Sequence, residues 1–158
     1  MVQSWQWVAA FDVQFTLRLN GLSLLFAMLV LGVGALVLSY APQYLDPHYE
    51  VRSLYTVLTL FAAAMLGIVL AGDLVLLLVF WEITSVSSFL LVAGAGTAGA
   101  RPAIRALVVT GFGGLALFGA VVLLAVKTQT TDIATVFALA PERLSVTDLS
   151  IVAALIIL

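Results

Sequence analysis

Four long runs of apolar residues dominate the hydrophobic pattern of the chain, and each is long enough to cross a membrane as a helix. A hydrocarbon core about 30 Å thick requires about 20 apolar residues in helical conformation. The pattern therefore predicts four transmembrane helices, at approximately residues 21–41, 54–71, 74–95 and 102–126. A fifth apolar run, at residues 149–158, is too short to span and is predicted to be an incomplete helix of a longer protein.

The segment before the first span has a different pattern. In residues 11–19 apolar and polar side chains alternate, which is typical of a strand with one covered face. Two interpretations stay open: an extended linker on the membrane surface, and an edge strand packed against the ends of the helices. A more polar stretch near residues 127–145 is predicted to be a loop, with a short interfacial helix at residues 133–139.

Polar and small residues mark the predicted helix ends. Asn20 precedes the first span and is a favoured N-cap. Gly72 and Asp73 are all that separate the second span from the third. We expect Gly72 to adopt the left-handed conformation that ends a helix, and Asp73 to cap the next helix rather than bind an ion.

Small residues inside two spans predict close helix packing. They are Ala63, Gly67 and Ala71 in the second span, and Gly111, Gly113, Gly114 and Gly119 in the fourth. Arginines in the shorter connections place the loops at residues 41–53 and 96–101 in the cytoplasm under the positive-inside rule. Residues 1–20 are then an extended segment on the extracytoplasmic side.

Composition supports a membrane protein and excludes several other classes. Of the 158 residues, 64% are hydrophobic and 9% are charged, whereas a soluble domain is about half apolar and about a quarter charged. The predicted fold class is therefore an all-α integral membrane protein, a transmembrane helix bundle with a short N-terminal extended segment. Cysteine is absent, histidine occurs once and the net charge is −2. We therefore expect no metal site and no nucleic-acid partner.

Glu82 is the ionisable residue that lies deep inside a predicted span. It follows Leu74 by about 12 Å along a helix that rises 1.5 Å per residue. A carboxylate at that depth costs several kcal/mol unless it is paired, hydrated or protonated. No Lys or Arg lies comparably deep in these spans, so a basic partner is expected outside this chain. Glu82 is then either a packing residue that locks helices through such a partner, or a carboxylate that carries protons or gates an ion path.

The other positions of this helix divide into two faces. The face that can meet lipid is apolar and consists of Val75, Val79, Ile83, Val86 and Leu90. The opposite face carries most of the polar side chains and consists of Trp81, Thr84, Ser85 and Ser88. Glu82 lies at the margin between the faces. We predict that Thr84 and Ser85 support it, by hydrogen bonds or by holding water.

These residues carry a resemblance to a known family. Residues 78–91, Leu-Val-Phe-Trp-Glu-Ile-Thr-Ser-Val-Ser-Ser-Phe-Leu-Leu, resemble the fifth transmembrane helix of the A-type subunit of Mrp-type multisubunit cation/proton antiporters. Residues 20–26, 64–67 and 106–115 resemble helices three, four and six of the same protein, in the right order and spacing. Asn20 stands where the family usually has Asp. The likeness covers about residues 11–158, or helices three to seven.

The same helices recur in the antiporter-like subunits of respiratory complex I. There the sequence after Trp-Glu usually turns toward Gly-Val-Gly-Leu-Cys-Ser-Tyr. The run Thr-Ser-Val-Ser-Ser at residues 84–88 favours the antiporter branch.

The resemblance implies a function and its partners. Glu82 would match the family's essential glutamate, and its basic partners would follow residue 158. The protein would be a secondary transporter subunit rather than an enzyme. It would exchange Na⁺ or K⁺ for H⁺ across the cell membrane, with other membrane subunits and without a bound cofactor. Two alternatives stay open: a proton-pumping membrane-arm subunit of a complex I-like NADH dehydrogenase, and a non-transporting assembly subunit.

Overall fold

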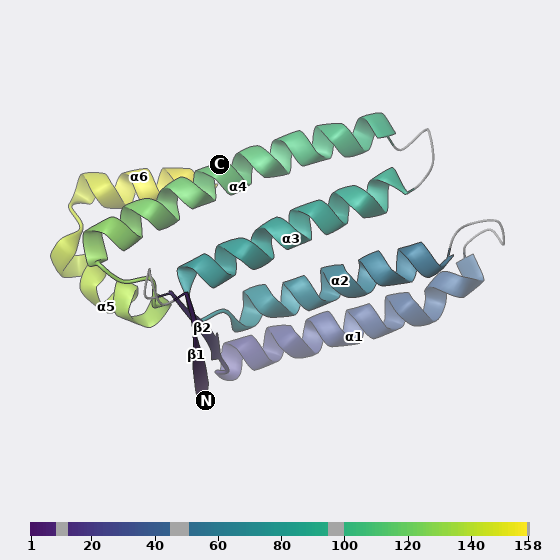
Figure 1. Ribbon diagram of the computed structural model, residues 1–158, viewed down its shortest axis with the longest axis horizontal. Coiled ribbons are helices and arrows are strands. Elements are labelled where there is room, and N and C mark those ends of the chain that lie inside the picture. The colour runs from purple at the N-terminus through teal and green to yellow at the C-terminus, as the bar shows by residue number, and fades with distance from the viewer. Residues whose placement is uncertain (9–12, 45–50, 95–99, 158) are drawn as a thin grey trace.

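The computed structural model describes residues 1–8, 13–44, 51–94 and 100–157. Four long helices lie in a row in chain order, each packed against the next (Figure 1). They are α1 (Gly21–Tyr44), α2 (Val51–Leu70), α3 (Leu74–Ala93) and α4 (Ala100–Thr128). The shorter helices α5 (Ile133–Arg143) and α6 (Val146–Ile157) pack against α4. Two strands, β1 (Val2–Val8) and β2 (Val13–Arg18), lie at the same end of the row as α5.

The four predicted spans are confirmed as helices that are long and apolar enough to cross a membrane. Their mean hydropathy lies between 2.1 and 2.5. Within the chain, 11% of the residues are buried in each of the first three spans and 17% in the fourth. Most of the apolar surface therefore faces outward, where it is stable against lipid or other membrane helices. The chain is a multi-pass membrane protein of all-α class.

Helix boundaries differ from the predicted ones by up to four residues. The helix predicted at 21–41 continues to Tyr44, and the one predicted at 102–126 runs from Ala100 to Thr128. The short helix predicted at 133–139 is longer and ends at Arg143, whereas the run predicted at 149–158 begins earlier, at Val146. Most of the two loops predicted to be cytoplasmic lies outside the described residues, and their side of the membrane stays a prediction.

The N-terminal segment is an antiparallel hairpin. Val2 pairs with Arg18 and Gln6 with Gln14, so β2 is the predicted alternating strand. Its first two predicted residues, Phe11 and Asp12, lie outside the described residues. Residues 1–20 were predicted to be extended, but the pattern did not identify β1 as a strand, because residues 2–8 alternate less regularly than β2.

The hairpin packs on the turn between α2 and α3. Leu17 forms a bridge with Ala71, and the N–H of Gly72 donates to the carbonyl oxygen of Thr16 at 2.7 Å. Of the two interpretations left open, the edge strand packed on the helix ends is therefore confirmed. The predicted left-handed conformation of Gly72 is wrong, because its φ lies outside the left-handed range. Glycine is needed there for space, since a Cβ would lie 2.7 Å from Cγ2 of Thr16.

Small residues let α2 and α3 approach closely, as predicted, although the stripe is shifted. Gly67 is buried, and a Cβ at Gly67 would collide with the ring of Phe80. Ala63 is exposed, and its neighbour Ala64 is buried instead, with 2% of its surface accessible. The contact between Gly67 and Phe80 therefore sets the distance between the two helices.

This contact gives the first prediction. Gly67→Ala should lower the thermal stability of the protein in detergent, because the added methyl group must displace an aromatic ring packed between two helices. Overpacking of this kind costs about 1–3 kcal/mol. Gly34→Ala is the matched control, since its Cβ would lie at an ordinary 3.9 Å from Cβ of Ala62. Equal melting temperatures for the two variants would contradict the assigned contact.

Candidate functional site

Asp73 fixes the start of the helix that carries Glu82. Its side chain accepts hydrogen bonds from the backbone N–H groups of Val75 at 2.8 Å and Leu76 at 3.4 Å. The predicted cap is confirmed. Glu82 lies nine residues further along, about 13 Å at 1.5 Å per residue, and therefore near the middle of α3.

The carboxylate of Glu82 lies directly against the backbone of α4. A Cβ built on Gly114 would collide with Oε1 of Glu82, and it would lie 3.1 Å from Cδ and 3.5 Å from Oε2. Oε1 thus points toward α4, and the carboxylate occupies space that any other residue type at position 114 would fill. The sequence pattern marked Gly114 only as a packing residue. Its place among the glycines of the fourth span was a signal for close approach, but that signal did not identify Glu82 as the neighbour.

Glu82 has no partner for its charge within the part of the chain that the structure describes. No described residue forms an ion pair with it or donates a hydrogen bond to its side chain. The residue is exposed when this chain is considered alone. Burying such a carboxylate without a donor or a cation would be costly. Stabilisation of its charged form must therefore come from water or from another part of the protein.

The predicted supporting residues do not contact Glu82 through their hydroxyl groups. Thr84 Oγ1 and Ser85 Oγ both donate to the carbonyl oxygen of Trp81, at 2.7 and 3.3 Å. Hydroxyl groups in helices often form such bonds to the preceding turn. Each oxygen can still accept a hydrogen bond from water. A role for Thr84 and Ser85 beside Glu82 stays a prediction that requires water.

The predicted polar face of α3 does line one cavity. Its volume is about 830 Å³, and it lies between α2, α3 and α4. The four predicted residues of that face all line it, and Thr110 adds a hydroxyl group from α4; the four are Trp81, Thr84, Ser85 and Ser88. Glu82 is not among the lining residues, which agrees with its predicted place at the margin of the face.

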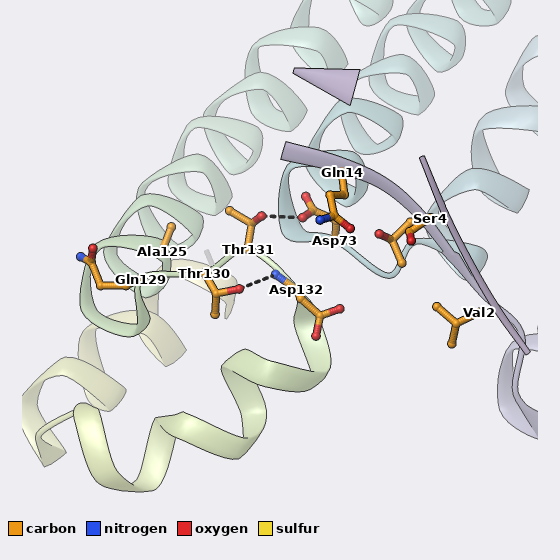
Figure 2. A pocket seen from close by; sticks show the side chains of 10 residues that line it. Val2, Ser4, Gln14, Asp73, Ala125, Gln129, Thr130, Thr131 and Asp132 are labelled. Atoms are coloured by element: carbon orange, nitrogen blue, oxygen red, sulfur yellow. Dashed lines mark hydrogen bonds between the residues drawn. The ribbon is translucent and has the colours of Figure 1, made fainter. Parts of the chain in front are cut away.

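A second, more polar pocket of about 420 Å³ lies at the hairpin end of the bundle (Figure 2). Thr131 donates its hydroxyl hydrogen to Asp73 there, and the N–H of Asp132 lies 3.3 Å from Oγ1 of Thr130 (Figure 2). Backbone hydrogen bonds join the same segments, from Leu74 to Thr131 at 2.9 Å and from Ile133 to Gly72 at 3.0 Å. This polar junction connects the start of α3 to the segment between α4 and α5.

Arg18 ties the hairpin to the same junction. Its guanidinium lies 3.0 Å from Oδ2 of Asp132, and 29% and 35% of the two side chains are exposed. Partial burial acts to raise the pKa of Asp132, but hydrogen bonds from Thr135 and the charge of Arg18 together hold that pKa below its ordinary value. Asp132 also caps α5, so one carboxylate joins β2 to α5. Within the described residues, no group of three or more His, Cys, Asp or Glu side chains could hold a metal ion.

Comparisons with known proteins identify relatives of the whole chain. Residues 5–55 match a family model described as complex I NADH-ubiquinone oxidoreductase, chain 5 N-terminus. Residues 71–158, more than half of the chain, match a model described as NADH:quinone oxidoreductase/Mrp antiporter transmembrane region. The chain is 41% identical over 138 residues to the A1 subunit of the Na⁺/H⁺ antiporter of Staphylococcus aureus strain Newman. That match covers 84% of this chain and 17% of the relative.

Solved structures are also similar to this chain. The structure of the Mrp complex from Dietzia sp. DQ12-45-1b matches with a TM-score of 0.93 and 40% identity, over 98% of this chain and 17% of that chain. An archaeal respiratory membrane complex, the membrane-bound sulfane sulfur reductase, matches with a TM-score of 0.79 and 25% identity. That match covers 90% of this chain and 29% of the matched chain of the reductase complex. The present chain thus spans about a sixth of the length of the antiporter subunits it matches.

The pair formed by Arg18 and Asp132 gives the second prediction. Because the pKa of Asp132 is lower in the folded protein, its contribution to stability is fully present above the ordinary value of 3.8. It is lost as the pH falls from there through the folded-state pKa. Asp132→Asn should therefore lower the melting temperature slightly at neutral pH, by an amount equivalent to about 1 kcal/mol or less. The difference from the unsubstituted protein should become smaller as the pH falls below 3.8.

Thermal unfolding in detergent between neutral pH and pH 3 measures this difference. Glu142→Gln is the control, since Glu142 is exposed on α5 and its side chain pairs with no described residue. A deficit of Asp132→Asn that persists unchanged at the acid end would contradict the assignment.

Proposed function

The chain belongs to the NADH:quinone oxidoreductase/Mrp antiporter family of membrane proteins, and from this premise we propose that it is part of the A-type subunit of a multisubunit Na⁺/H⁺ antiporter. The observation that carries the proposal is the identity of 40–41% to the A1 subunit of one antiporter and to a chain of a solved Mrp complex, with matching helices throughout. The complete protein would lie in the cell membrane with other membrane subunits, and it would exchange Na⁺ or K⁺ for H⁺.

Glu82 is the residue that we propose carries protons on this path. It is the carboxylate near the middle of an apolar helix, it is accessible in this chain alone, and no described residue partners it. In hydrocarbon the neutral carboxylic acid is much less costly than the carboxylate. Approach of a cation reverses that preference, because an opposite charge stabilises the ionised form. A carboxyl group that alternates between these two environments can take up a proton in one and release it in the other.

Water would complete the path on the polar face of α3. Thr84 and Ser85 line the cavity beside Glu82 and keep acceptor capacity after donating to Trp81. The cavity of about 830 Å³ is large enough for several water molecules; most of its lining is apolar, and Thr84, Ser85, Ser88 and Thr110 supply its hydroxyl groups. We propose that such water molecules relay protons between Glu82 and the cavity.

The second candidate function is that of a membrane-arm subunit of a redox-driven complex, and one observation supports it. The archaeal sulfane sulfur reductase complex shares this arrangement of helices at 25% identity. The higher identity to antiporter subunits supports the first proposal instead.

The third prediction tests Glu82. Glu82→Gln in the complete antiporter should reduce Na⁺-driven proton movement by about ten-fold or more, because an amide has no ionisable group that could bind and release a proton at physiological pH. Everted membrane vesicles with a fluorescent pH indicator give the rate, and immunoblotting shows that the complex assembles. Glu142→Gln, an exposed site on α5, is the matched control and should retain the normal rate. Full activity in Glu82→Gln would overturn the proposed role, and loss of assembly would favour a packing role.

The fourth prediction separates the two candidate functions. The purified complex should contain no flavin absorbance and no iron–sulfur signal, and Na⁺ added under an imposed proton gradient should move protons without NADH. Flavin and iron–sulfur subunits that co-purify in constant ratio with this chain would establish the redox-driven arm instead.

A further inference from the structure

Gly114 is unlike the other glycines of α4 in what lies opposite its α-carbon. A Cβ built on Gly111 or Gly113 would have no atom within 4 Å, and one built on Gly119 would make an ordinary contact at 3.6 Å. A Cβ on Gly114 would collide with Oε1 of Glu82. Gly114 is also buried, whereas Gly111 is partly exposed. The requirement for glycine at position 114 is therefore tied to one functional group, the Glu82 carboxylate.

We propose that Gly114 is a positioning residue that seats the Glu82 carboxylate against α4; this rests on the proposed function, in which Glu82 carries protons. Gly114 positions the carboxylate only by lacking a side chain at this point. It brings Oε1 against the helix backbone, where the glycine offers only C–H groups, and such contacts are weak. Oε2 lies 3.5 Å from the Cβ position, farther from it than Oε1. The seat thus leaves one carboxylate oxygen free to meet a donor, a cation or water.

A methyl group at position 114 would unseat the carboxylate without disturbing the helices. The atom that it meets is the far end of a flexible side chain, so rotation of Glu82 relieves the clash. At Gly67 the added Cβ would instead collide with several atoms of the Phe80 ring, among them Cγ, which lies next to the backbone of α3 rather than at the far end of a flexible side chain. No described residue is held in place by Glu82, and alanine is favoured over glycine inside a helix by about 1 kcal/mol. Gly114→Ala should therefore assemble normally.

Displacement of the carboxylate should slow proton transfer. Restoring an ordinary contact requires Oε1 to move by on the order of 1 Å. Proton exchange needs donor and acceptor within about 2.6–3.2 Å, so a shift of that size breaks a hydrogen bond. Misplacement of a reacting group by 1 Å can cost about 100-fold in rate. Displacement also changes the surroundings of the carboxyl group, and with them the pH dependence of transport.

The fifth prediction uses the complete antiporter in everted vesicles. Gly114→Ala should lower the rate of Na⁺-driven proton movement about ten-fold or more at the normal pH optimum, and should shift the half-maximal pH by about half a unit or more. Gly111→Ala is the matched control, because its methyl group meets open space one turn away. It should change neither the rate nor the pH profile. A rate loss with an unshifted profile would indicate a structural effect and overturn the inference, as would a variant identical to Gly111→Ala.

A second variant keeps the test decisive if Gly114→Ala fails to assemble. Glu82→Asp shortens the side chain by one methylene group and draws the carboxylate back from the position of the added methyl group. Assembly restored in the double variant Glu82→Asp, Gly114→Ala would trace the clash to Glu82 and support the seat. Assembly that stays lost would overturn it. Full activity in Glu82→Gln would instead refute the proposed function, and the inference with it.

Discussion

The cost of placing a carboxylate in an apolar helix is the constraint on which the rest of this structure depends. Four helices of high hydropathy present most of their surface to lipid or to neighbouring helices, and Glu82 lies near the middle of the third. A charge at that depth is retained only where something uses or compensates it. The described residues supply space for the carboxylate at Gly114 but no charge partner. A partner for the charge must therefore come from water or from residues outside the described part of the chain.

The polar junction at the hairpin end holds the geometry that brings Glu82 and Gly114 together. Asp73 begins α3 and accepts a hydrogen bond from Thr131, which follows α4. That link relates the start of one helix to the end of the next. Because α3 and α4 run antiparallel, this link determines which residues of α4 lie opposite Glu82. The hairpin reinforces the junction through Gly72 and through the ion pair of Arg18 with Asp132.

Much of the fold followed from sequence patterns because the membrane imposes simple rules on length and hydropathy. The four spans, the Asp73 cap and the strand that became β2 were all predicted from local patterns. The strand β1 was missed, and Gly72 was assigned the wrong conformation, because its role is to leave space for Thr16, a residue far away in the sequence. The same limitation applies to the site. Glu82 was found from its depth alone, whereas its seat on Gly114 and the bonds of Thr84 and Ser85 to Trp81 depend on side-chain positions.

Chemical modification of Glu82 tests the central claim most directly, because carbodiimides react with protonated carboxylic acids in apolar surroundings. The complete antiporter would be treated with dicyclohexylcarbodiimide across a range of pH, and the adducts located by mass spectrometry alongside measurements of transport. A proton-carrying Glu82 predicts an adduct at this residue that forms faster as the pH falls, with transport lost in proportion to its yield. Asp73, which is tied into a cap, should remain unmodified. Complete modification of Glu82 with transport intact, or its absence at every pH while transport continues, would contradict the account.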